Sequence, residues 1–190
     1  MSAATPAEEP DAPSHGRRGR SPEPSASITY RRSGAGFHHF PTKMDFGYAL
    51  VDEVLAGMIA AQWVEPLRTS DDPLGTIATE FARGVNLLRS MRPILGCPLN
   101  NLAQEMNPLD EGFRSRTSNV FSMWRATFRD ALDRGQQMGV VADGATVDVA
   151  HTLVAQIEGV LSLARNSQDP DDLTTGARGL RRYLDALRVP

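Results

Sequence analysis

The stretch Phe37-His38-His39-Phe40-Pro41-Thr42-Lys43 leads directly into an apolar, periodic run from Met44 to Ala61. Thr42 and Asp45 are residue types that begin helices, and Pro41 is tolerated in a first turn because its missing N–H has no partner there. The apolar side chains that follow repeat at spacings of three and four, which places them on one helix face; they are Met44, Tyr48, Val51, Leu55, Met58 and Ile59. The sequence therefore predicts a long amphipathic helix beginning at this stretch.

Further stripes of helical spacing follow, separated by proline- and aspartate-rich segments. Pro66 and the cluster 69–73 break the first stripe, and Asp71 or Asp72 can cap a second helix that Pro93 stops. The remaining stripes predict a short helix near 100–106, a long one over 110–137 and two closing helices over about 145–167 and 173–188. Nothing alternates with period two over a useful length, so the fold class is all-α, with about six helices in residues 41–190.

Composition limits the number of domains, the classes of partner and the cellular compartment that suit this chain. Its 190 residues suit one domain, and a formal charge of −3 gives no overall nucleic-acid signature. The single cysteine, Cys97, excludes an intrachain disulfide and suits a reducing compartment. We see no secretory signal and no apolar run near the roughly 20 residues of a membrane span. We therefore expect a cytoplasmic protein with no membrane contact.

Residues 1–36 differ in composition from the rest of the chain. They hold five of the 13 prolines and no Leu, Val, Phe or Trp, so they cannot bury enough apolar surface to offset the entropy of ordering. Five arginines make the segment locally basic, which suits either phosphate contact or, more simply, a solvated tail. We predict that residues 1–36 are a disordered tail.

Four segments resemble the TetR (tetracycline-repressor-like, AcrR-like) family of transcriptional regulators, and together the resemblance covers residues 33–190. They are Phe37–Lys43, Gly96-Cys97-Pro98-Leu99-Asn100-Asn101-Leu102-Ala103, the helix over 110–137, and Arg181-Arg182-Tyr183-Leu184-Asp185-Ala186-Leu187. In this family a segment like Phe37–Lys43 joins the recognition helix of a helix-turn-helix to the fourth helix. The resemblance implies a ligand-binding and dimerisation domain over residues 41–190.

The same resemblance implies DNA-backbone contacts by Phe37, His38 and Lys43. Phe37 lacks the hydroxyl of the usual tyrosine, so its phosphate hydrogen bond is lost, and such contacts position a protein without reading bases. Upstream, a helix-turn-helix needs three helices with turns between them, roughly 40 residues in all, and residues 1–36 show no apolar periodicity. Residues 37–43 are then the remnant of a DNA-binding junction.

Two explanations of this upstream segment stay open. Either the helix-turn-helix has degenerated, or the N-terminal sequence results from a frameshift or a misplaced start and is not the native one. The first function hypothesis is a ligand-responsive TetR-family repressor that binds operator DNA. The alternative is a dimeric ligand-binding or interaction module that no longer binds DNA.

A ligand pocket for a small-molecule effector and a homodimer interface also follow from the resemblance. The pocket candidates by position are Phe81, Met91, Cys97, Asn100, Phe121, Trp124, Arg125 and Phe128, although aromatic stripes of this kind also form ordinary cores. Cys97 is either a small apolar residue at a bend or a redox- or electrophile-sensing thiol. The candidates for the four-helix dimer interface are Val149, Leu153, Ile157, Val160, Leu161, Leu180, Tyr183 and Leu184, which also suit a buried helix of a monomer.

The sequence contains no recognisable catalytic motif. No nucleophile and base are paired in a recognisable motif, and Ser33-Gly34-Ala35-Gly36 follows no predicted strand. The histidine pair has no further ligands at metal-binding spacing. We expect no enzyme activity, no cofactor and no metal.

Overall fold

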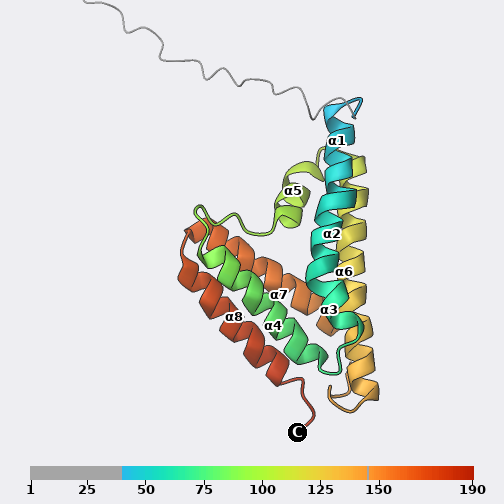
Figure 1. The fold of residues 1–190 in the computed structure, drawn as a ribbon, viewed down its shortest axis with the longest axis vertical. Helices are drawn as coiled ribbons and strands as arrows, with labels where there is room; N and C mark the ends of the chain where they lie inside the picture. Colours follow the sequence, from blue (N-terminus) through green and yellow to red (C-terminus); the bar gives the residue numbers. More distant parts are fainter. Residues whose placement is uncertain (1–39, 145) are drawn as a thin grey trace, which may run out of the picture. The chain divides into compact units, whose positions relative to one another are not determined.

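The computed structural model of the chain describes residues 40–144 and 146–190. These residues form helices joined by short connections (Figure 1), and their one pairing of extended backbone is an isolated bridge between Val141 and Arg188. The all-α prediction is confirmed. The predicted disordered tail, together with Phe37 and His38, lies outside the described residues.

The first helix runs without interruption from Lys43 to Arg68, and we call it the long helix. It consists of α1 (Lys43–Ala49), a π-helical segment (Leu50–Leu55), α2 (Ala56–Ile59), a second π-helical segment (Ala60–Val64) and α3 (Glu65–Arg68). Thr42 caps it as predicted: its hydroxyl accepts from the Asp45 N–H at 3.0 Å, and the Asp45 carboxylate accepts from the Thr42 N–H at 3.0 Å. Pro41 precedes this cap and does not lie in the first turn.

The prediction that Pro66 breaks this helix is wrong, because the helix continues to Arg68. A proline inside an α-helix removes one hydrogen bond and clashes with the preceding turn. Here the wider π-helical turn Ala60–Val64 comes directly before Glu65 and Pro66, so the ring follows a turn that is already opened.

Aspartate caps begin two helices in the middle of the chain. Asp72 caps α4 (Pro73–Arg89) by accepting from the Gly75 N–H at 3.0 Å, and Asp110 caps α6 (Glu111–Gln137) by accepting from the Phe113 N–H at 2.8 Å. Between them lies the short helix α5 (Pro98–Met106). These local bonds set where each helix begins.

Two helices close the chain, α7 (Thr146–Ser167) and α8 (Pro170–Asp185). The last helix begins before the predicted Leu173, because Asp169 accepts from the Asp171 N–H at 2.9 Å and Pro170 occupies the first turn. Helices α4, α7 and α8 pack side by side, and the long helix lies along α6 (Figure 1). Helix α6 also contacts α7 and so joins the two groups.

One connected core fills the space between these helices. Its largest fully buried side chains include Trp63 of the long helix, Trp124 and Phe128 of α6, and Leu153 and Ile157 of α7. The stripe from Met44 to Ile59 contributes only Val51, Leu55 and Ile59 to this core, whereas Met44 and Met58 are exposed. The long helix therefore turns one narrow face inward.

Helix α7 is long and apolar enough to cross a membrane by length and composition, although we expected no such helix from the sequence. A helix packed in the core of a soluble protein meets the same criteria, and α7 packs on α6 and α8. Only a third of its most apolar 18-residue window is buried. The other side of α7 is therefore uncovered in the single chain, and the apolar side chains of Val147 and Leu163 are exposed there.

Candidate functional site

An apolar cavity of about 150 Å³ lies among the long helix, α4, the connection leading into α5, α6 and α7. Its lining is hydrocarbon and aromatic, except for the side chains of Gln62 and Cys97 and the indole N–H groups of Trp63 and Trp124. Small-molecule sites are typically apolar with a few polar groups, and a cavity of this size holds a single aromatic ring. The cavity is therefore a candidate ligand site.

Stacked aromatic rings form the wall between the long helix and α6. Trp63 and Trp124 stack with ring centroids 5.5 Å apart and planes inclined by 22°, and Phe121 stacks on Trp124 at 6.3 Å. Phe128 meets Trp63 edge to face at 5.2 Å. Positions 121, 124 and 128 lie at helical spacing on α6, so one face of α6 holds three of the four rings and the long helix supplies the fourth, Trp63.

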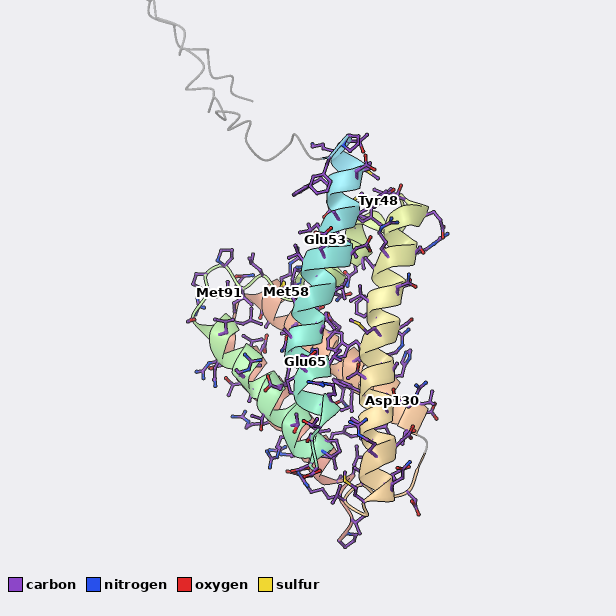
Figure 2. The ribbon with its side chains drawn as sticks, turned by 45° about the vertical axis from the view of Figure 1, so that its right-hand side comes forward. Tyr48, Glu53, Met58, Glu65, Met91 and Asp130 are labelled. Carbon is purple, nitrogen blue, oxygen red and sulfur yellow. The ribbon has the colours of Figure 1, made fainter. Side chains whose placement is uncertain are left out.

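The mouth of the cavity lies between the long helix and the C-terminal part of α4. Met58 and Leu87 belong to its lining and are also 51% and 66% exposed. Figure 2 shows Met58 on the long helix near the end of α4, beside which Met91 is labelled. Exposed methionine and leucine side chains are flexible apolar groups, so they suit an adaptable entrance.

Glu158 of α7 is buried next to this site. It follows the lining residue Ile157, is 8% exposed, and neither of its carboxyl oxygens has a hydrogen-bond partner. Burial raises its pKa to about 7, and the neighbouring Cys97 thiol and Asn100 side chain reduce this shift only partly. A carboxyl with no cation beside it therefore lies behind the part of the wall formed by Cys97.

Cys97 lies between the cavity and this carboxyl. Burial, followed by the charge of Glu158, raises the pKa of its thiol to about 12. The thiolate is the reactive form of cysteine. The surroundings of Cys97 therefore favour the inert apolar alternative over a sensing thiol.

The structure brings three of the eight predicted pocket residues to the cavity, namely Phe81, Cys97 and Trp124. The other five lie outside its lining for separate reasons. Phe128 is fully buried against Trp63, Phe121 is half-buried on the outer side of the stack, and Met91 is exposed. The polar pair bonds elsewhere: Asn100 donates to the Ser162 hydroxyl at 3.4 Å and Arg125 donates to the Ser122 hydroxyl at 3.1 Å.

Sequence reasoning missed Trp63 and Glu158. Trp63 lies four residues after Ile59 and so continues the apolar stripe of the long helix, a signal that the expected break near Pro66 concealed. Glu158 is a charged residue within the apolar stripe of α7, beside Ile157 and one turn before Leu161. A charge at such a position is the sequence signal of a buried carboxyl.

The predicted dimer-interface residues fall into two groups. The side chains of four of them are buried within the single chain, so they are core residues and present no surface to a partner: Leu153, Ile157, Leu180 and Leu184. The other four are half-buried, namely Val149, Val160, Leu161 and Tyr183, and Leu161 lines the cavity. Apolar residues cover more than one side of α7 because this helix packs on both α6 and α8 within the chain.

A different face of α7 is exposed. Val147, His151, Ala155, Gly159 and Leu163 recur every four residues along it, and Val147 and Leu163 are 63% and 64% exposed. We call this row of five residues the outer face of α7.

Of the predicted DNA-contact residues, only Lys43 is described. It is exposed and is the first residue of the long helix. Just before it, Phe40 packs edge to face on Phe46 with ring centroids 5.5 Å apart. Among residues 40–144 and 146–190 no group of three or more His, Cys, Asp or Glu side chains is placed to hold a metal ion.

Known proteins resemble this chain in both sequence and fold. The family model "Transcriptional regulator LmrA/YxaF-like, C-terminal domain" matches residues 73–178. A transcriptional regulator from Cereibacter sphaeroides, AcuR, is 27% identical over 157 residues, covering 80% of this chain and 69% of its own. An uncharacterised helix-turn-helix-type regulator from Lactococcus lactis is 26% identical over 144 residues, covering 72% of this chain and 68% of its own.

Solved structures of regulators share the arrangement of helices. A TetR regulator from Chloroflexus aurantiacus superposes with a TM-score of 0.69 at 25% identity, covering 80% of this chain and 77% of its own. A TetR regulatory protein from Rhodobacter sphaeroides superposes with a TM-score of 0.70 at 24% identity, covering 83% and 82%. The family match spans more than half of the chain, so this protein belongs to the TetR family of transcriptional regulators, with a C-terminal domain of the LmrA/YxaF-like type.

Proposed function

We propose that this regulator is a ligand-responsive repressor whose effector binds the cavity beneath the long helix. The observation that carries the proposal is that one helix does two things. It supplies Leu55, Ile59 and Trp63 to the cavity wall, and its first residue, Lys43, is the last residue of the segment that resembles a DNA-binding junction. A ligand that moves this helix would therefore change how any DNA-contacting residues before it are held.

The π-helical segments support this coupling. One covers Leu50–Leu55 and the other Ala60–Val64, so both contain cavity-lining residues. Such widened turns occur often at functional sites and hold fewer regular hydrogen bonds than an α-helix. A ligand that favours one hydrogen-bonding register of this helix would rotate the part that precedes it.

We also propose that the protein acts as a homodimer in the cytoplasm through α7 and α8. Support comes from the outer face of α7, which has apolar ends at Val147 and Leu163 and small residues at Ala155 and Gly159, and which is left uncovered in the single chain. Obligate dimers bury roughly 2,000 Å² or more of largely apolar surface. Residues 41–190 would then form the ligand-binding and dimerisation domain, with residues 37–43 as the junction and residues 1–36 as a tail.

DNA contact by Phe37, His38 and Lys43 belongs to the same proposal. The exposed Lys43 ammonium is free of any ion pair in the described part of the chain, so it is available to a phosphate. The composition of residues 1–36 favours the second candidate, a dimeric ligand-binding or interaction module without DNA binding of its own. In both cases we propose a regulator with no catalytic activity.

A gel-shift titration separates these candidates. Purified full-length protein is mixed with the DNA upstream of its own gene, at low and moderate salt, with a scrambled duplex of equal length as the control. A repressor gives a salt-sensitive shift on the upstream DNA alone. Equal or absent shifts on the two duplexes would rule out operator binding and leave the module.

A further inference from the structure

Four buried side-chain polar atoms in the described part of the chain lack a hydrogen-bond partner; two belong to residues that line the cavity, and two belong to a residue directly behind its wall. They are the indole Nε1 atoms of Trp63 and Trp124 and the two carboxyl oxygens of Glu158. Both tryptophans line the cavity, and Glu158 adjoins its lining residues Ile157 and Cys97. Buried polar atoms are nearly always paired, so their gathering in and directly behind one cavity wall indicates a missing polar partner.

The Glu158 carboxyl indicates which chemical group on a ligand would be the missing hydrogen-bond partner. It is nine-tenths buried, and none of the ion pairs in the described residues includes it. An ionised carboxyl without a cation is costly in an apolar surrounding. A neutral hydroxyl can pair with the protonated carboxyl but leaves the charge of the ionised form unpaired, whereas an ammonium group supplies several donors and the charge that favours the ionised form.

The volume and the aromatic lining of the cavity indicate the size and the apolar part of the ligand. Its volume of about 150 Å³ suits one aromatic ring, and the stacked indoles of Trp63 and Trp124 offer ring faces to it. Indole faces also attract cations, and carboxylate ligands would be repelled by Glu158. The mouth between Met58 and Leu87 gives such a compound an apolar entrance.

We propose that the cavity binds a small aromatic amine in its protonated form, with the ring against Trp63 and Trp124 and the ammonium group reaching past the Cys97 side chain to the Glu158 carboxyl behind it. Larger effectors of this class would carry an oxygen that accepts from an indole N–H. The inference rests on the proposed function, because it names the ligand class of the same cavity.

Benzylamine and benzyl alcohol test the inference directly, since they share one ring and one shape and differ in charge. Trp63 and Trp124 are the only two tryptophans of the chain and both line the cavity, so intrinsic fluorescence reports occupancy. We expect benzylamine to bind the full-length protein about tenfold or more tightly than benzyl alcohol at neutral pH, which is the usual effect of a charged hydrogen bond.

Two variants make the test specific. Glu158→Gln keeps the side-chain shape and should remove the preference for benzylamine, while the affinity for benzyl alcohol stays within about threefold. The matched control is Glu53→Gln, which neutralises an exposed carboxylate of the long helix (labelled in Figure 2) and should keep the preference. If the Glu158 variant fails to fold, infrared difference spectra of the unmodified protein replace it: benzylamine should remove the band of a protonated buried carboxyl, and benzyl alcohol should not.

The outcomes distinguish this inference from the proposed function. Equal binding of the two probes, or a preference that persists in Glu158→Gln, would overturn the amine class and leave the cavity as an effector site. An infrared carboxyl band unchanged by bound benzylamine would do the same. Failure of both probes to change the fluorescence would overturn the inference and the effector site together.

Discussion

Glu158 is a carboxyl within an apolar helix stripe, and its burial makes the stability of the protein depend on pH. Its pKa is raised from 4.5 to about 7 in the folded chain, so the folded state holds its proton more tightly than the unfolded state does. The contribution of Glu158 to stability is therefore full below pH 4.5, is lost as the pH rises from 4.5 to 7, and stays lost above that.

The first prediction follows for Glu158→Gln, which removes this ionisation. Above pH 7 the variant should be more stable than the unmodified protein by about 3 kcal/mol, from a pKa difference of 2.5 units at 1.36 kcal/mol per unit, and the advantage should vanish below pH 4.5. Urea unfolding across this pH range measures it. Glu53→Gln, at an exposed position, should show no such trend; a constant difference at all pH values would contradict the assignment to Glu158.

The second prediction concerns the reactivity of the Cys97 thiol. A pKa raised from 9.0 to about 12 lowers the thiolate fraction near neutral pH about 1,000-fold. Iodoacetamide should therefore alkylate native protein at least that much more slowly than protein unfolded in urea, as followed by mass spectrometry. Rapid labelling of the native thiol would instead favour the sensing thiol that the sequence left open.

At the scale of the elements, α7 and α8 approach closely at Gly176. A methyl group added there would press into the side chain of Val160, whereas one added at Gly57 of α2 would meet no atom within 4 Å. Both glycines lie within helices, so alanine at either position gains the same helical preference. The two positions therefore form a matched pair that separates packing from helix propensity.

The third prediction concerns this pair. Gly176→Ala should destabilise the protein by about 1–3 kcal/mol through overpacking, and Gly57→Ala should stabilise it by about 0.5–1 kcal/mol through reduced chain entropy. Thermal and urea unfolding of both variants measure these effects. Stabilisation by Gly176→Ala would show that α7 and α8 can separate at little cost.

At the scale of the whole molecule, the outer face of α7 should be the dimer surface. The fourth prediction is that Leu163→Arg changes the mass in light scattering from about twice 20.7 kDa to 20.7 kDa, because a buried unpaired charge opposes association. Leu109→Arg is the control: Leu109 is 77% exposed between α5 and α6, so its variant should remain dimeric. A dimeric Leu163→Arg protein would place the interface elsewhere.

The helix order followed from the sequence because its causes are local. Thr42, Asp72 and Asp110 cap helices through bonds to residues three positions away, and these caps were predictable from residue type. The prediction of a helix break at Pro66 was wrong because the helix accommodates this proline through the π-helical turn before it. The residue types of that turn do not indicate a π-helix. Membership of the family was likewise visible in short segments such as Gly96–Ala103.

The sequence by itself thus determined the all-α class, the succession of helices and the resemblance to TetR regulators, since each rests on spacing and capping within about one turn. Only the tertiary structure decided which face of each apolar stripe is core, cavity or surface. It buried Leu153 and Ile157 within the chain, placed Trp63 against Trp124, and left Glu158 without a partner. These outcomes depend on contacts between helices far apart in the sequence, whose geometry no single stripe contains.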